Sequence, residues 1–170
     1  TLKAIKDLGT IYKGFLYAGI MIVDNEPFLI EYNVRMGDPE CQTILPKLKT
    51  DFIDIVESCV NYNLESLKIN WYQEETICIV LCSKGYQDQY ENNSEINNLN
   101  KINLNENEFI FHAGTKSYKS KIFSNGGRVL NFVIRSKDLK QARDRAIELI
   151  YQLNWSNGFF RKDIGFKVIK

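Results

Sequence analysis

Polar side chains alternate with apolar ones in the run Glu31-Tyr32-Asn33-Val34-Arg35, which is the pattern of an exposed strand face. Glu31 and Asn33 stand two residues apart, so an extended chain projects both to the same side. A carboxylate and an amide oxygen are hard oxygen ligands, which suit Mg²⁺ or Mn²⁺. The pair therefore has the chemistry of a divalent-metal site, although a solvated strand face without chemistry gives the same short pattern.

Two more charged residues follow the pair. Arg35 continues the same face if the strand lasts that far, and a guanidinium there can hold a phosphate or carboxylate with two hydrogen bonds. Asp38, which follows Gly37, adds a second carboxylate on a flexible turn. Together these side chains suit a metal-bound nucleoside triphosphate and an anionic or zwitterionic substrate.

A β-hairpin must position these residues. Residues 15–23 form an apolar run typical of a buried strand, residues 24–27 carry a turn signal, and residues 28–33 form a second strand. We expect the two strands to pair in antiparallel fashion. Strict alternation along the second strand puts three side chains on one face: Leu29, Glu31 and Asn33. Pro39 favours a helix that begins near Glu40.

The rest of the chain mixes helices with strands. A helix is expected over residues 51–61, capped by Thr50 or Asp51, and a change in composition places a domain boundary near residue 72. Beyond it we expect strands from residue 76, over 109–112 and over 128–134, and a helix over 137–153. This mixed order, with prominent hairpins, predicts an α+β fold.

Two loop segments have a distinctive composition. The asparagine-rich segment 92–107 is expected to be a loop with one or two edge strands. Asn125-Gly126-Gly127 is expected to be a tight turn whose glycines supply positive φ angles.

Composition limits the partners that the chain can have. The formal net charge is +1 over 170 residues, without the basic excess of a nucleic-acid-binding protein. The longest apolar runs are too short to span a bilayer, and no signal peptide is evident at Thr1. One histidine and four cysteines without a C-x-x-C pair provide no zinc ligand set. We therefore expect a cytoplasmic protein with reduced, buried thiols, and no membrane or nucleic-acid partner.

Five separated motifs resemble one enzyme family. The segment 14–22, followed by I-E-Y-N-V-R-M-G-D-P-E-C-Q at 30–42, resembles the end of the ATP-grasp domain in phosphoribosylamine–glycine ligases, also called glycinamide ribonucleotide synthetases. The later motifs follow the family's order: S-K-G-Y at 83–86, F-H-A-G-T at 111–115, S-N-G-G-R-V-L at 124–130 and R-K-D-I-G at 161–165. The resemblance implies the C-terminal part of an ATP-grasp domain over residues 1–72, followed by a small mixed α/β C-terminal domain over residues 73–170.

The resemblance also implies a reaction. Members of this family join glycine to 5-phosphoribosylamine in purine biosynthesis, using ATP to phosphorylate the glycine carboxylate before the amine attacks it. By their place in the motif, Glu31 and Asn33 match ligands for Mg²⁺ or Mn²⁺, and Leu29 matches a contact to the nucleotide base. Arg35 and Asp38 match groups around the transferred phosphate and the glycine.

Other motif residues have two interpretations each. His112 either helps to bind substrate or is a hydrogen-bonded structural histidine. The glycines at 126 and 127 either approach a ligand or only form a turn. Arg128, Arg161, Lys162 and Asp163 either engage the ribose phosphate or form structural salt bridges.

The family's full chain is much longer than this one. Its N-terminal domain and most of its ATP-grasp domain, including the lid over the nucleotide, have no counterpart in these residues. We therefore expect the chain to work with the remainder of the same protein and to be inactive alone. One alternative is a non-catalytic binding or interaction module that retains an ATP-grasp remnant. Another is a different ATP-grasp ligase, such as a carboxylase relative, although the motifs after residue 83 argue against it.

Overall fold

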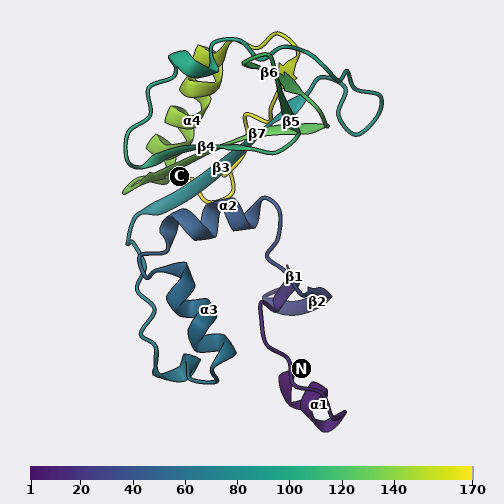
Figure 1. Ribbon diagram of the computed structural model, residues 1–170, viewed down its shortest axis with the longest axis vertical. Helices are drawn as coiled ribbons and strands as arrows, with labels where there is room; N and C mark the ends of the chain where they lie inside the picture. The colour runs from purple at the N-terminus through teal and green to yellow at the C-terminus, as the bar shows by residue number, and fades with distance from the viewer. Residues whose placement is uncertain (170) are drawn as a thin grey trace. The chain divides into compact units, whose positions relative to one another are not determined.

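The computed structural model describes residues 1–169 of the chain, which divide into two compact units (Figure 1). The N-terminal unit comprises Thr1–Cys41 and Leu48–Trp71, and the C-terminal unit comprises residues 42–47 and the chain from Tyr72 onward. The backbone therefore crosses between the units three times. The predicted domain limits, 1–72 and 73–170, stay a prediction.

An antiparallel hairpin is the main element of the N-terminal unit, as predicted. Strand β1 (Tyr17–Val23) pairs with β2 (Glu26–Asn33) through a turn at Asp24 and Asn25, whose φ angles are 51° and 64°. Positive φ at both turn residues matches the right-handed twist of the strands. The other elements of this unit are helical: α1 (Leu2–Asp7), α3 (Phe52–Val60) and the short 3₁₀ helix η2 (Leu64–Ser66).

The apolar residues of this hairpin are exposed, so the expectation of a buried strand over residues 15–23 is wrong for this chain. The two strands form a sheet of their own, and a strand is buried only when other layers cover its faces. The exposed fractions of the apolar side chains include Ile20 54%, Met21 53%, Ile22 61%, Phe28 56% and Ile30 65%. The apolar run predicts which residues favour burial, but not which segment covers them.

Helix α3 forms where the sequence predicts it. The side chain of Asp51 accepts a hydrogen bond of 2.8 Å from the backbone N–H of Ile53, which satisfies one donor of the first turn. Phe52 stacks on Phe15 with 5.8 Å between the ring centroids. The helix is therefore packed against the segment that leads into β1.

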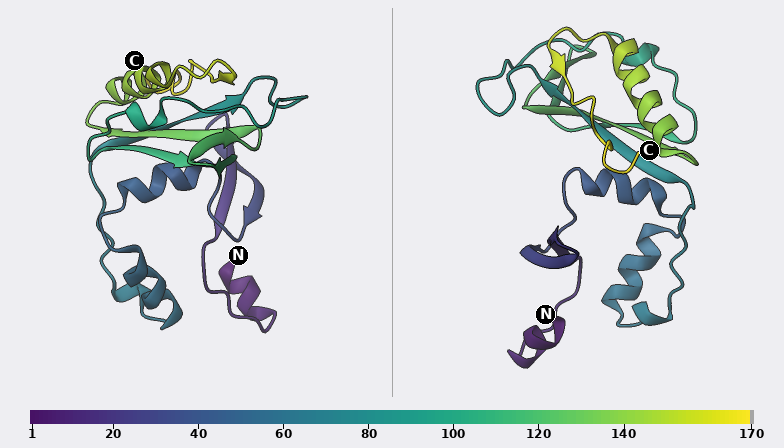
Figure 2. Two further views of the ribbon diagram at one scale, coloured as in Figure 1. Left: turned by 45° about the horizontal axis from the view of Figure 1, so that its top comes forward. Right: turned by 180° about the vertical axis from the view of Figure 1, so that it is seen from behind.

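The C-terminal unit is an antiparallel sheet with one long helix across it, and Figure 2 shows this arrangement from two sides. The strand order is β4-β7-β3-β8. The strands and helices of this part are β3 (Glu75–Ser83), η3 (Leu99–Lys101), β4 (Glu108–His112), β5 (Thr115–Tyr118), β6 (Lys121–Ser124), β7 (Arg128–Ser136), α4 (Leu139–Leu153) and β8 (Gly158–Phe159). Helix α2 (Glu40–Ile44) and the 3₁₀ helix η1 (Leu45–Lys47) lead into it. These elements confirm the α+β prediction.

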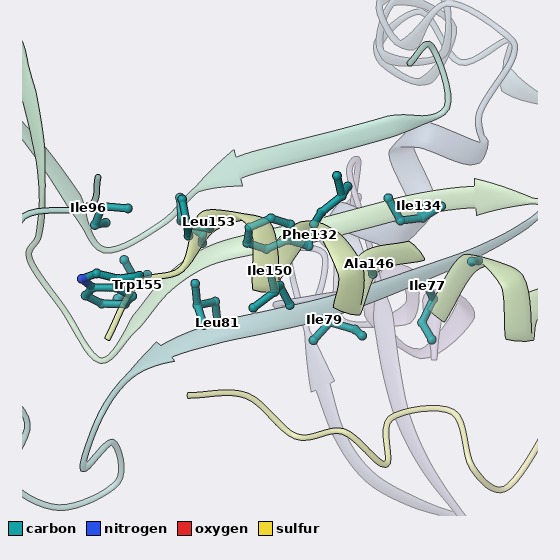
Figure 3. Packing of buried hydrophobic residues seen from close by; sticks show 14 residues of the cluster. Ile77, Ile79, Leu81, Ile96, Phe132, Ile134, Ala146, Ile150, Leu153 and Trp155 are labelled. Atoms are coloured by element: carbon teal, nitrogen blue, oxygen red, sulfur yellow. The ribbon is translucent and has the colours of Figure 1, made fainter. Parts of the chain in front are cut away.

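The core of this unit lies between the sheet and α4, as Figure 3 shows. Alternate residues of β3, namely Ile77, Ile79 and Leu81, face the helix together with Phe132 of β7. The helix contributes a stripe spaced by three and four residues: Ala142, Ala146, Leu149, Ile150 and Leu153. Asp138 caps α4 by accepting a 2.7 Å hydrogen bond from the backbone N–H of Gln141. The helix predicted over residues 137–153 is confirmed, and Leu139 at its start is only partly buried.

The predictions for one loop and for the burial of the thiols are wrong. Segment 92–107 contains no edge strand; it has the helix η3 and one isolated bridge between Glu95 and Phe123. Its apolar residue Ile96 is inserted into the core instead, with 4% exposure. The burial of the thiols also differs from expectation: none of the four forms a disulfide, but only Cys82 is buried and the other three are half-buried.

Gly126 and Gly127, the two glycines after Asn125, allow close packing and do not adopt positive φ angles. Neither Gly126 nor Gly127 has a positive φ angle. A Cβ on Gly127 would lie 2.6 Å from Cε2 of Tyr86, and a Cβ on Gly114 would lie 2.9 Å from the Cα of Gly126. Three of the motifs therefore meet at one end of the sheet because glycine lets their backbones and one ring approach closely.

Candidate functional site

Glu31 and Asn33 lie on one face of β2, as alternation predicts. The side-chain amide of Asn33 donates a hydrogen bond of 2.7 Å to Oε1 of Glu31. Across the hairpin, Glu31 pairs with Gly19, and a Cβ on Gly19 would lie only 3.2 Å from Cγ of Glu31. The glycine therefore leaves the space over which the carboxylate side chain lies. Sequence reasoning missed this role of Gly19, which only the strand register reveals.

The donor set of this pair fits a hard divalent cation. Because the Asn33 Nδ2 group points to Glu31, Oδ1 of Asn33 and the second carboxylate oxygen of Glu31 stay available as ligands. Within residues 1–169, no group of three or more His, Cys, Asp or Glu side chains could hold a metal by itself. Mg²⁺ commonly takes one or two protein carboxylates and completes its shell with phosphate oxygens and water. The arrangement suits a metal that arrives with a nucleotide.

Leu29 does not share this face, so the prediction of one common face is wrong for that residue. The register pairs Glu31 with Gly19 but Leu29 with Ile20, which leaves Ile30 as an extra residue in β2. This β-bulge interrupts the alternation, and directly paired residues point to the same side of a sheet. Since Gly19 and Ile20 are neighbours with opposite orientations, Leu29 and Glu31 lie on opposite sides.

Arg35 and Asp38 lie beyond the end of the strand. β2 ends at Asn33, so strand alternation does not orient Arg35, whose Nη1 donates to the carbonyl of Met36 at 3.0 Å. Asp38 immediately precedes Pro39 and helix α2. Burial raises the pKa of the Cys41 thiol, and the charge of Asp38 raises it further. The carboxylate of Asp38 therefore lies near the first turn of α2.

The other motif residues have local partners. Nδ1 of His112 lies 2.9 Å from the hydroxyl oxygen of Thr115, which favours the structural interpretation of that histidine. Arg161 binds Asp163 through two hydrogen bonds of 3.0 and 2.6 Å. Lys162 lies over the ring of Tyr151, 5.4 Å from its centroid. These contacts favour structural roles for the residues of the R-K-D-I-G motif.

The C-terminal unit also contains a charged cavity of about 380 Å³ that sequence reasoning missed. None of the five predicted site residues lines it. At its wall the buried carboxylate of Glu108 forms a two-bond ion pair with Arg145, at 2.7 and 3.2 Å. Burial alone raises the pKa of Glu108, but hydrogen bonds from Arg145 and from the backbone of Asn105 bring it below its ordinary value. The residues are 37 positions apart, so no local pattern could have predicted the pair.

Comparison with known proteins identifies the family. The sequence model for the C domain of phosphoribosylglycinamide synthetase matches residues 76–167, and the model for the ATP-grasp (A) domain of the same enzyme matches residues 1–41. The chain belongs to the phosphoribosylglycinamide synthetase family. Its fold is thus a fragment of an ATP-grasp domain joined to the synthetase C domain, as the sequence resemblance implied.

Relatives within the synthetase family cover almost all of the chain. A phosphoribosylamine–glycine ligase from Caldanaerobacter subterraneus is 40% identical over 161 residues, which are 95% of this chain and 38% of the relative. The chloroplastic ligase of Arabidopsis thaliana is 36% identical, over 100% of this chain and 33% of the relative. A crystal structure of phosphoribosylamine–glycine ligase from Thermotoga maritima superimposes with a TM-score of 0.76 at 31% identity, covering 95% of this chain and 39% of that one. The chain therefore spans about two fifths of the length of such synthetases.

No helix within residues 1–169 has the length and apolar character needed to cross a bilayer.

Proposed function

We propose that this chain is the C-terminal part of a cytoplasmic ligase that joins glycine to 5-phosphoribosylamine at the expense of ATP. The observation that carries the proposal is the Glu31–Asn33 pair, held together by a 2.7 Å hydrogen bond on the hairpin that the ATP-grasp model matches. The relatives named phosphoribosylamine–glycine ligase support the choice of substrates.

In this proposal Glu31 and Asn33 bind Mg²⁺ or Mn²⁺ through the oxygens that their mutual hydrogen bond leaves available. The bound metal offsets the negative charge of the ATP phosphates. Leu29, which is 51% exposed and lies on the sheet face opposite to Glu31, contacts the nucleotide base in this proposal. Arg35 and Asp38 orient the transferred phosphate and the glycine, since a guanidinium suits phosphate oxygens and a carboxylate suits the glycine ammonium group.

The partner in this proposal is the remainder of the same ligase. Two-stranded hairpins are at best marginally stable in water, and large exposed apolar patches mark interaction surfaces. The hairpin presents apolar side chains that are about half exposed or more on both strands, such as Ile22 and Ile30. The relatives are about two and a half times as long as this chain. The missing part therefore supplies both a cover for the hairpin and the other wall of the nucleotide site, and the chain alone is inactive.

A chimera tests the proposal. This chain replaces the corresponding C-terminal region of the Caldanaerobacter subterraneus relative, which is 40% identical to it. We expect the purified chimera to form ADP only when glycine and 5-phosphoribosylamine are both present, whereas the isolated chain forms none. A correctly folded chimera that forms no glycine-dependent ADP would contradict the ligase and favour a non-catalytic module.

A further inference from the structure

The side chain of Arg135 joins separate parts of the C-terminal unit. Its Nε and Nη2 donate to Oδ1 of Asn107 at 3.1 and 2.6 Å, and its Nη1 donates to the carbonyl of Pro46 at 2.7 Å. The guanidinium carbon lies 3.6 Å from the ring centroid of Tyr72. Only arginine can serve all these partners together, because its planar fork donates along its edges while its face stacks on a ring.

Pro46 and Tyr72 flank two of the places where the chain crosses between units. The first stretch of the C-terminal unit ends at Lys47, and the unit resumes at Tyr72. The intervening residues, which include α3, belong to the N-terminal unit. Arg135 thus holds the chain just before it leaves the C-terminal unit and just after it returns.

From the residues that Arg135 holds, the chain continues as a narrow pair of segments, residues 47–50 and 70–72. We call this pair the stem and its end at Pro46 and Tyr72 the base. Two short segments that run antiparallel are held together by backbone hydrogen bonds. The contacts of the stem are Tyr72 N–H to the Lys47 carbonyl at 2.9 Å, an antiparallel bridge between Leu48 and Trp71, and Lys49 N–H to the Asn70 carbonyl at 3.0 Å. Such a short ribbon is weak by itself, so its register depends on what anchors its base.

We propose that Arg135 is a positioning residue that clamps the base of the stem, so that the segment carrying α3 leaves and re-enters the C-terminal unit at one fixed point. The charged guanidinium makes hydrogen bonds stronger than those of a neutral donor, and it fixes Pro46 and Tyr72 at the same time. The crossing point then stays constant whatever arrangement the two units take. This inference goes beyond the proposed function, because it concerns the chain crossing and not the reaction.

Amide hydrogen exchange on the full polypeptide that contains this chain tests the clamp. Arg135→Lys keeps the charge but loses the fork and the stacking face. We expect the amides of Lys49 and Tyr72 to exchange at least about tenfold faster, while the core amides of Phe132 and Leu149 keep their rates. Unchanged exchange at the stem, or equal acceleration throughout the C-terminal unit, would overturn the proposal.

Two further variants separate the clamp from a general loss of stability. Arg143→Lys is the matched control, since Arg143 pairs with the exposed Asp144 on α4 at 3.0 Å and should leave the stem unchanged. Tyr72→Leu removes the stacking ring but keeps the backbone N–H. If the clamp exists, combining Tyr72→Leu with Arg135→Lys accelerates stem exchange no further than Arg135→Lys alone. Independent, multiplying effects would contradict it.

Discussion

The side-chain amide of Asn33 donates a 2.7 Å hydrogen bond to the carboxylate of Glu31, two residues earlier on the same strand. This bond holds a carboxylate and an amide oxygen on one face of the strand, and it leaves one oxygen of each side chain available. Outer contacts that orient a ligand usually affect metal affinity strongly. The pair therefore acts as a unit, and losing either member disturbs both.

Removing either member of this pair should abolish most of the proposed ligase activity. In the ligase chimera, we expect Glu31→Gln and Asn33→Ala to lower kcat/KM by roughly two orders of magnitude or more, because the metal loses a direct ligand. The thermal midpoint should change little, since the hydrogen bond of the pair is local and joins residues only two positions apart. Steady-state kinetics over a range of Mn²⁺ concentrations and a thermal melt give both readouts. Glu26→Gln, on the same strand, is the control and should keep the activity; near-normal rates in both test variants would remove the metal assignment.

Gly19→Ala should weaken metal binding without touching a ligand. An added Cβ would lie 3.2 Å from Cγ of Glu31, so the side chain of Glu31 must shift from its place beside Asn33. We expect the dissociation constant for Mn²⁺ to rise by about tenfold, as for the loss of other orienting contacts. Electron paramagnetic resonance of free Mn²⁺ measures it directly. Ala18→Ser, which changes the neighbouring residue on the other face, should have no effect, and equal affinities in all three proteins would show that Gly19 does not position the carboxylate.

Local patterns predicted the elements well and the contacts between them poorly. The cap at Asp51 and the helix α4 depend on neighbours a few residues away, so sequence alone locates them. The bulge that moves Leu29 off the face of Glu31 and Asn33 depends on the register of the partner strand. The partners of Arg135 lie 28 and 89 residues away, and no periodicity encodes such distances. The prediction of a buried strand over residues 15–23 is wrong for a similar reason, because burial depends on chain segments that lie outside the local pattern.

Gly127→Ala should destabilise the C-terminal unit because the added methyl group clashes with the ring of Tyr86. A Cβ there would lie 2.6 Å from Cε2 of Tyr86, and overpacking of this kind costs about 1–3 kcal/mol. The φ angle of Gly127 is not positive, so backbone strain contributes nothing to the loss. Urea unfolding curves of Gly127→Ala alone and with Tyr86→Ala measure the effect. In the Tyr86→Ala background the glycine substitution should cost almost nothing, whereas a full cost there would point to a cause other than the ring.

The ion pair between Glu108 and Arg145 should make stability depend on acid pH. Arg145 holds the pKa of Glu108 below its ordinary value of 4.5 in spite of burial. A carboxyl with a lowered folded pKa contributes stability that is complete above the unfolded pKa and is lost as pH falls through the folded pKa. We therefore expect the free energy of unfolding to fall below about pH 4.5. Glu108→Gln should flatten that part of the curve, and an unchanged slope would show that other groups cause it.

Arg145→Leu should reverse the sign of this dependence. The carboxylate of Glu108, which is 6% exposed, then lies buried without its partner, and breaking such a pair costs about 3–5 kcal/mol. Burial then raises the pKa of Glu108 against only the hydrogen bonds from Asn105. We expect burial to win, so that the contribution of Glu108 to stability is present at low pH and is lost as pH rises through the raised value. Urea unfolding at pH 7 and pH 5 should show the variant closer to wild type at the lower pH. Glu148→Gln removes the other, exposed partner of Arg145 at 2.8 Å, so it should cost less than about 1 kcal/mol at either pH. If Arg145→Leu is no more sensitive to rising pH than Glu148→Gln, the buried carboxylate is not what Arg145 stabilises.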